Sequence, residues 1–139
     1  MKQKVLVDTG PLVSILSLSD THHQRCITTL QTLQPPLLTC WSVITETHWL
    51  IRKNKVAVTS LFKMIEGGLI EVVHLPEESI PWLKIFILKY HDIGVQIADA
   101  SLCYLAEIRD LDTIFTLDRR DFSIYRIRNN QTLKIIPEF

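Results

Sequence analysis

Four acidic residues stand where their carboxylates could act together: Asp8, Glu46, Asp99 and Asp118. Carboxylates that cluster repel one another, so either one of them has a raised pKa or a hard divalent cation binds to their oxygens. Such a cation activates a water molecule and stabilises the charge on a phosphodiester. The histidines and cysteines show no shared metal-ligand spacing, so the acids favour Mg²⁺ or Mn²⁺ over Zn²⁺. The chemistry that this pattern indicates is metal-assisted hydrolysis.

The hydropathy pattern predicts strands that alternate with helices. Short apolar runs bounded by polar or turn residues predict strands at residues 5–7, 37–41, 69–73, 113–116 and 133–136. Apolar residues at helical spacing predict helices from Pro11 and at about 22–33, 42–52, 56–66, 76–90 and 96–108, with Asp20-Thr21 and Ser42 as candidate N-caps. This alternation implies an α/β fold, in which helices cover both faces of a parallel sheet.

Three of the four acids are expected at one edge of this sheet. Asp8 ends the first predicted strand, Glu46 follows the second, and Asp118 follows the fourth. The carboxyl ends of parallel strands meet at one edge, where open α/β sheets bind ligands, so these three acids should converge there. Asp99 lies early in a predicted helix, among small apolar residues, where an acid either interacts with the helix dipole or serves as a ligand.

Taken alone, the acids also have simpler interpretations. Asp8 belongs to a turn-like Asp-Thr-Gly sequence, and Glu46 could be a first-turn acid that interacts with the helix dipole. Asp118 and Asp121 flank two arginines and could form local ion pairs. Asp99 needs a partner if it is buried, and a metal site would supply one. The order and context of all the acids favour the shared site.

Length and composition are those of one ordinary globular domain, with 139 residues, of which 47% are hydrophobic. Lys plus Arg and Asp plus Glu both number 15, and this zero net charge argues against a protein that coats nucleic acid through bulk charge. Zero net charge still allows a local basic segment. Four arginines after the fourth acid could contact phosphates beside the acids, or form a solvated surface: Arg119, Arg120, Arg126 and Arg128.

Cysteine usage and hydropathy indicate a cytoplasmic protein. The three cysteines, Cys26, Cys40 and Cys103, are far apart and form no Cys-x-x-Cys pair, so free thiols in a reducing compartment are expected. The apolar run near the N-terminus stops at Asp8, which makes it too short for a signal peptide. We also expect no membrane span, because no apolar stretch is long enough.

Four segments, in order, resemble the motifs of PIN-domain nucleases, and in particular of the VapC-type toxins of bacterial toxin–antitoxin pairs. They are residues 5–12, 42–46, 97–102 and 115–122. The resemblance covers essentially the whole chain, so residues 1–139 are expected to form a single PIN-like domain. It implies a three-layer α/β/α sandwich with a parallel sheet of about five strands. It also implies Mg²⁺- or Mn²⁺-dependent endonucleolytic cleavage of RNA by a homodimer, with a cognate antitoxin that blocks the acidic groove.

The resemblance also assigns roles by position. Asp8, Glu46, Asp99 and Asp118 match the catalytic and metal-binding acids, Thr116 a hydroxyl that faces the site, Asp121 a further acid, and Arg119 and Arg120 candidate RNA contacts. Asp8, Asp99 and Asp118 would hold the metal, and Glu46 would complete the ligand shell or orient the attacking water. Gln96 is a departure, since many relatives have another acid three residues before the third one. That difference bears on how strongly a second metal ion would bind.

Three other functions compete with this one. Leu6-Val7-Asp8-Thr9-Gly10 looks like the Asp-Thr-Gly of aspartic proteases, but those enzymes are all-β. A phosphatase with an aspartyl nucleophile would usually have a second Asp two residues later, where this chain has Gly10. A catalytically inactive, PIN-like binding module is the third alternative, although an inactive site has little reason to keep a costly cluster of charges.

Overall fold

The computed structural model describes residues 4–138 and contains one sheet of five parallel strands in the order β3-β2-β1-β4-β5. The strands are β1 Leu6–Val7, β2 Leu37–Thr39, β3 Ile70–Val72, β4 Thr113–Phe115 and β5 Lys134–Ile136. The central strand β1 pairs with its neighbour β4 through Leu6 with Ile114 and Val7 with Phe115, and none of these four side chains is exposed. The residues that follow β1 and β4 therefore emerge side by side.

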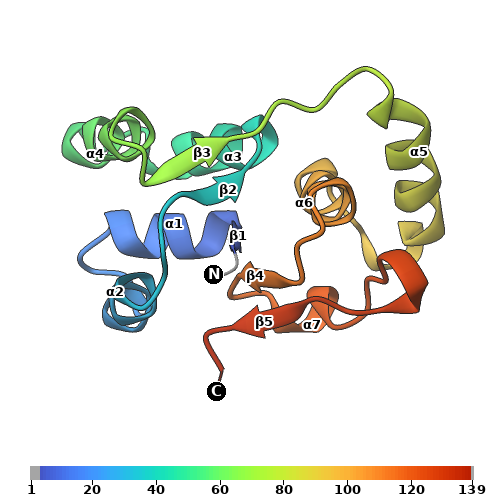
Figure 1. The fold of residues 1–139 in the computed structure, drawn as a ribbon. Helices are drawn as coiled ribbons and strands as arrows, with labels where there is room; N and C mark the ends of the chain where they lie inside the picture. Colours follow the sequence, from blue (N-terminus) through green and yellow to red (C-terminus); the bar gives the residue numbers. More distant parts are fainter. Residues whose placement is uncertain (1–3, 139) are drawn as a thin grey trace.

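Within residues 4–138, seven α-helices surround the sheet, together with two short 3₁₀ turns. They are α1 Thr9–Leu16, α2 His23–Gln31, α3 Trp41–Ile51, α4 Lys55–Glu66, α5 Ser79–Lys89, α6 Ile97–Ile108 and α7 Arg119–Phe122, with η1 His91–Ile93 and η2 Arg128–Asn130. Figure 1 shows α1 and α2 on one side of the strands and α5 and α6 on the other. The expected α/β/α architecture is confirmed, and its parallel sheet excludes the all-β aspartic protease. Within residues 4–138, no helix combines the length and apolarity of a membrane span.

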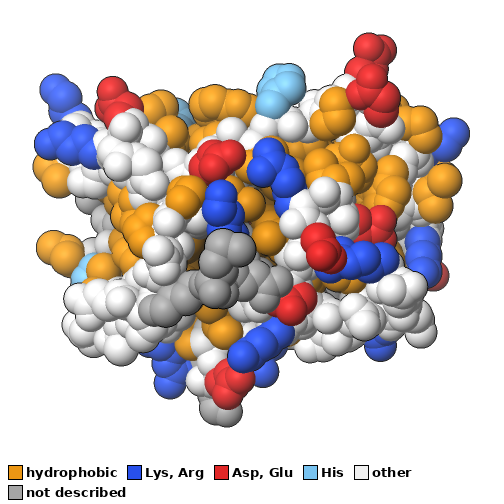
Figure 2. All heavy atoms as spheres, viewed as in Figure 1, with side chains coloured by type: hydrophobic (Ala, Val, Ile, Leu, Met, Phe, Trp, Pro, Cys, Tyr) orange, Lys and Arg blue, Asp and Glu red, His pale blue; other side chains and the backbone are white. Residues whose placement is uncertain are grey.

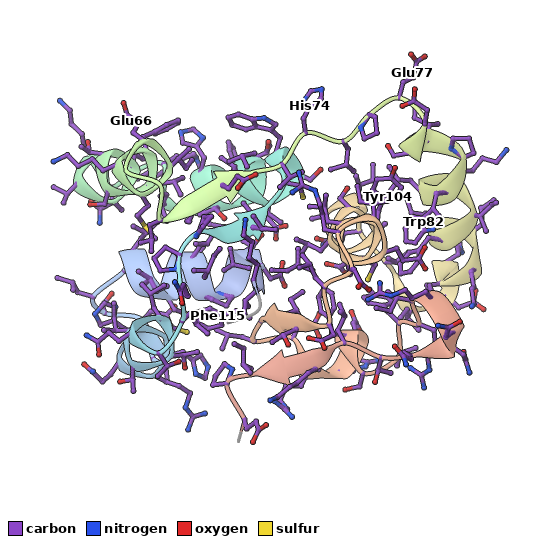
Figure 3. All side chains as sticks on the ribbon, viewed as in Figure 1. Glu66, His74, Glu77, Trp82, Tyr104 and Phe115 are labelled. Carbon is purple, nitrogen blue, oxygen red and sulfur yellow. The ribbon has the colours of Figure 1, made fainter. Side chains whose placement is uncertain are left out.

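Helix α6 is buried more completely than its amphipathic neighbours. Every residue from Ala98 to Ala106 is buried, including Asp99. On the side away from the sheet it packs on α5, where Trp82 and Tyr104 point toward one another with ring centroids 5.3 Å apart (Figure 3). A helix that is enclosed in this way holds any polar group on it in a fixed position.

The sequence misplaced some element boundaries. The predicted Ser42 cap is wrong: α3 begins at Trp41 after an extended Cys40, and β2 ends at Thr39 rather than continuing to residue 41. The hydroxyl of Thr39 donates to the carbonyl of Val7 at 2.8 Å and fixes that end of the strand against β1. Helix α7 was not predicted, because four residues are too few to show a helical period.

Candidate active site

A cavity of about 410 Å³ lies at the carboxyl ends of β1 and β4. It is lined by Asp8, Thr9, Gly10, Glu46, Leu50, Gly94, Gln96, Asp99, Leu117, Asp118 and Asp121. Five of these residues carry a carboxylate, and none of the described residues that line it is Lys or Arg. All four acids of the predicted site therefore share one cavity, as does Asp121. The cavity is a strongly negative pocket in a chain whose overall charge is zero.

Asp8 connects the end of β1 to the start of α1. Its Oδ1 accepts a hydrogen bond from the backbone N–H of Thr9 at 2.8 Å, so Asp8 is the N-cap of the helix, and Pro11 occupies the first turn. Its Oδ2 accepts a hydrogen bond from the hydroxyl of Thr116 at 2.8 Å. Burial raises the pKa of Asp8 to about 7 against the opposing effect of these two donors, and the charges of Asp99 and Glu46 raise it further.

Thr116 joins the two strand ends of the site. Besides donating to Asp8, its Oγ1 accepts a hydrogen bond from the backbone N–H of Asp118 at 3.0 Å. Asp118 in turn caps α7, because its Oδ1 accepts from the backbone N–H of Asp121 at 3.0 Å. This chain of hydrogen bonds fixes three acidic residues relative to one another, and it places the α7 turn at the rim of the cavity.

Asp99 enters the cavity from the first turn of α6. The backbone N–H of Gln96 and the hydroxyl of Tyr125, the latter at 2.7 Å from Oδ2, both donate to its carboxylate. Burial raises the pKa of Asp99 to about 6; these donors oppose the shift, and the charges of Asp118 and Asp121 add to it. Burial and the charge of Asp118 also raise the pKa of Asp121.

The donor set fits a hard divalent cation. Asp99, Asp118 and Asp121 each offer a carboxylate oxygen, and these oxygens lie within 4.8 Å of one another. Oxygen ligands from a few carboxylates, completed by water, are what Mg²⁺ uses in proteins. Asp8 and Glu46 line the same cavity outside this group of three, with Glu46 contributed by α3. Asp121 is thus more central than the sequence suggested.

One buried polar atom of the site has no partner. Thr9 Oγ1 is the only buried side-chain nitrogen or oxygen among the described residues that lacks a hydrogen bond. Buried hydroxyls normally find a partner in the protein or in ordered water. A hydroxyl without a protein partner, on a residue that lines an acidic cavity, fits a site completed by a cation with its waters or by substrate.

The basic residues after the fourth acid divide into two groups. Arg119 and Arg120 are exposed on α7, beside Asp118 and Asp121, where the sequence predicted RNA contacts. Arg119 also donates from Nη1 to the carbonyl of Pro137 at 3.0 Å. Arg126 and Arg128 are half-buried, and their guanidinium groups donate to backbone carbonyls of residues 123–125 and of Ala106 and Leu111, respectively. On the face shown in Figure 2, basic, acidic and apolar side chains are interspersed. That face therefore offers no broad basic surface.

Comparison with known proteins identifies the family. A sequence model of the PIN domain matches residues 5–128. The chain belongs to the PIN domain family. This PIN domain is similar to Ribonuclease VapC26 of Mycobacterium tuberculosis, with 26% identity over 135 residues that cover 96% of this chain and 100% of the relative. It also matches the crystal structure of Mycobacterium tuberculosis VapC20, described as a sarcin–ricin loop cleaving toxin, with a TM-score of 0.71. The match covers 80% of this chain and 87% of that one at 13% identity, and it shows the fold.

Proposed function

We propose that this PIN domain is a Mg²⁺- or Mn²⁺-dependent endoribonuclease, and that it is the toxin of a toxin–antitoxin pair. The observation that carries the proposal is the cavity in which five carboxylates meet without a lining Lys or Arg among the described residues. The membership of the PIN domain family and the full-length similarity to a VapC ribonuclease support the choice of RNA as substrate.

The acids would divide the work according to their positions. Asp99, Asp118 and Asp121 would hold the cation, because their oxygens lie within 4.8 Å of one another. Asp8, fixed through both oxygens by Thr9 and Thr116, would complete the ligand set directly or through water. When bound, the cation supplies an activated water and neutralises charge on the phosphate. Glu46, on the α3 wall of the cavity, would orient the attacking water.

The remaining side chains would bind the substrate. Arg120, exposed on α7, would contact a phosphate beside the scissile bond, and Arg119, whose Nη1 also donates to the carbonyl of Pro137, would contact a second one. Hydrolysis would leave a 5′-phosphate and a 3′-hydroxyl, as the PIN-domain resemblance implies.

A cognate antitoxin and a second copy of the chain are the proposed partners. A hollow of about 590 Å³ lies between the α1–α2 connection and α4, and its lining includes Leu18 and Val56, which are 86% and 76% exposed. Large apolar side chains exposed in this way are typical of protein interfaces. We place the protein in the cytoplasm, where the free cysteines at positions 26, 40 and 103 would stay reduced.

The decisive experiment compares cleavage of a mixed RNA pool by wild type, Asp8→Asn and Asp92→Asn, with Mn²⁺ and with EDTA. Asp92 lies in η1 and does not line the cavity, so its variant makes the same chemical change away from the site. We expect Mn²⁺-dependent cutting by wild type and Asp92→Asn, and none by Asp8→Asn, with all three folded by circular dichroism. Full activity of Asp8→Asn would rule out this site. A folded wild type that cuts nothing would favour the inactive binding module.

A further inference from the structure

Tyr125 brings a buried hydroxyl to the acidic site from a segment without regular structure. Its hydroxyl donates to Asp99 Oδ2 at 2.7 Å across 26 residues of sequence, and the side chain is 1% exposed. Asp99 also accepts a hydrogen bond from the backbone N–H of Gln96, at the start of its own helix. The carboxylate is therefore held by one donor from the N-cap residue of α6 and by a second donor from a distant part of the chain.

The Tyr125 ring is itself held by an aromatic cluster. Its centroid lies 5.4 Å from that of Phe86, 5.1 Å from that of Tyr90 and 5.2 Å from that of Phe122. The next residue is also fixed, because the backbone N–H of Arg126 donates to the Tyr90 hydroxyl at 2.9 Å. Aromatic rings packed on several sides have little rotational freedom. The Tyr125 hydroxyl can therefore act as a fixed point from which Asp99 is oriented.

We propose that Tyr125 is a positioning residue for the cation site: its hydroxyl fixes the Asp99 carboxylate so that Asp99, Asp118 and Asp121 form a preorganised set of oxygen ligands. The inference builds on the proposed function only in taking Asp99 as a ligand. The competing explanation is that Asp99 merely provides a partner for a buried tyrosine hydroxyl. The two explanations differ in what they predict for cation affinity, since partners that orient a ligand commonly change the affinity by 10- to 100-fold.

The test is titration calorimetry of Mn²⁺ into wild type, Tyr125→Phe and Tyr104→Phe. Tyr125→Phe removes the donor and keeps the ring in its cluster. Tyr104→Phe is the matched control, because Tyr104 is a buried tyrosine of the same helix as Asp99, packs edge-on against Trp82 and does not line the cavity (Figure 3). We expect Tyr125→Phe to bind Mn²⁺ about tenfold more weakly than wild type. We expect Tyr104→Phe to bind it as wild type does. Equal affinity for Tyr125→Phe and wild type would overturn the proposal.

A second measurement needs only wild-type protein. With ¹³C at the tyrosine Cζ positions, Mg²⁺ should move the NMR resonance of Tyr125 and leave that of Tyr104 in place, because only Tyr125 bonds to a cation ligand. A Tyr125 resonance that stays fixed while Mg²⁺ binds would contradict the proposal. Neither measurement reads RNA cleavage, so a protein that binds Mn²⁺ but cuts no RNA would contradict the proposed ribonuclease function alone.

Discussion

The hydroxyl of Thr116 lies 2.8 Å from Asp8 Oδ2, although the two residues are 108 positions apart in the chain. The contact exists because β1 and β4 pair in parallel and end at the same edge of the sheet. The hydroxyl oxygen of Thr116 also accepts a hydrogen bond from the backbone N–H of Asp118 at 3.0 Å. One buried hydroxyl therefore sets the relative position of two acids of the site.

Thr116→Val keeps the shape of the side chain and removes this link. The buried carboxylate of Asp8 and the part-buried N–H of Asp118 would each lose a partner, so the free energy of unfolding should fall by about 1–3 kcal/mol. Asp8 and Asp118 would no longer be held together, and Mn²⁺ affinity and any RNA cleavage should also fall. Urea unfolding and calorimetry measure the two effects separately.

Thr39→Val is the control for that experiment. Thr39 is buried in the neighbouring strand and donates to the carbonyl of Val7 at 2.8 Å, but it does not line the cavity. Its loss should lower stability by a similar amount and leave Mn²⁺ affinity unchanged. If both variants weaken Mn²⁺ binding equally, the Thr116 hydroxyl has no specific role at the site.

The cation-free protein should lose stability as the pH rises from 5 to 8. The folded-state pKa of Asp8 is raised to about 7 and that of Asp99 to about 6, whereas an unfolded Asp titrates near 3.8. At a pH between the unfolded and the folded pKa, the folded state retains protons that the unfolded state has released. Stability is therefore greatest below the unfolded-state pKa, and it is lost as the pH rises through the folded-state pKa. Each carboxyl contributes a slope of up to about 1.4 kcal/mol per pH unit.

Urea unfolding in EDTA at several pH values measures this slope. Asp8→Asn removes the group with the larger shift, so its stability should depend less on pH and should exceed that of wild type at pH 8. Mg²⁺ should stabilise wild type more at pH 8 than at pH 5, because cation binding requires the ionised carboxylates. A pH-independent stability of the wild type would contradict the raised pKa values.

The sequence located the acids better than it located the groups that hold them. Asp8 and Asp118 were predictable because each follows an apolar strand run, and parallel strands end at one edge. Asp99 was predictable as an acid placed among small apolar residues at a helix start. Tyr125 was not, because its bond to Asp99 depends on tertiary packing across 26 residues and leaves no local pattern.

The division of roles among the acids was also beyond the sequence. Asp121 belongs to the group of three close carboxylates, and it lies on the short helix α7, which Asp118 caps. The spacing of Asp118 and Asp121 does not predict where the Asp121 side chain points unless the α7 helix is known. Glu46 was predicted beside the other acids, and it lines their cavity from α3 without joining the close group.

Asp121→Asn tests this division directly. If Asp121 is one of three close ligands, removing its charge should weaken Mn²⁺ binding by about tenfold or more, and Glu46→Gln should weaken it less. Asp92→Asn, on the exposed η1 turn, should leave the affinity unchanged. Calorimetry at one pH compares all four proteins. A larger effect of Glu46→Gln than of Asp121→Asn would place the cation nearer α3.

Arg120 is the cation of α7 whose position most favours a contact with RNA. It is exposed, and its charge lowers the pKa of Asp121, so it lies close to the rim of the acidic cavity. One contact between an Arg and a phosphate contributes about 0.7 to the slope of log affinity against log salt for single-stranded nucleic acid. Arg120→Gln should therefore weaken RNA binding and reduce that slope by about 0.7.

Fluorescence anisotropy with a labelled single-stranded RNA, in an Asp8→Asn background that prevents cleavage, gives this slope from a series of salt concentrations. Arg109→Gln is the control, because Arg109 is exposed at the opposite end of α6 from Asp99, roughly 15 Å along the helix axis. The Arg109 variant should keep the wild-type slope. If both variants change the slope equally, Arg120 has no specific contact with RNA, and the charge of the whole surface determines binding. A chain with zero net charge is not expected to bind RNA strongly in that way. A loss confined to Arg120→Gln would mean that RNA crosses the α7 rim to reach the acids.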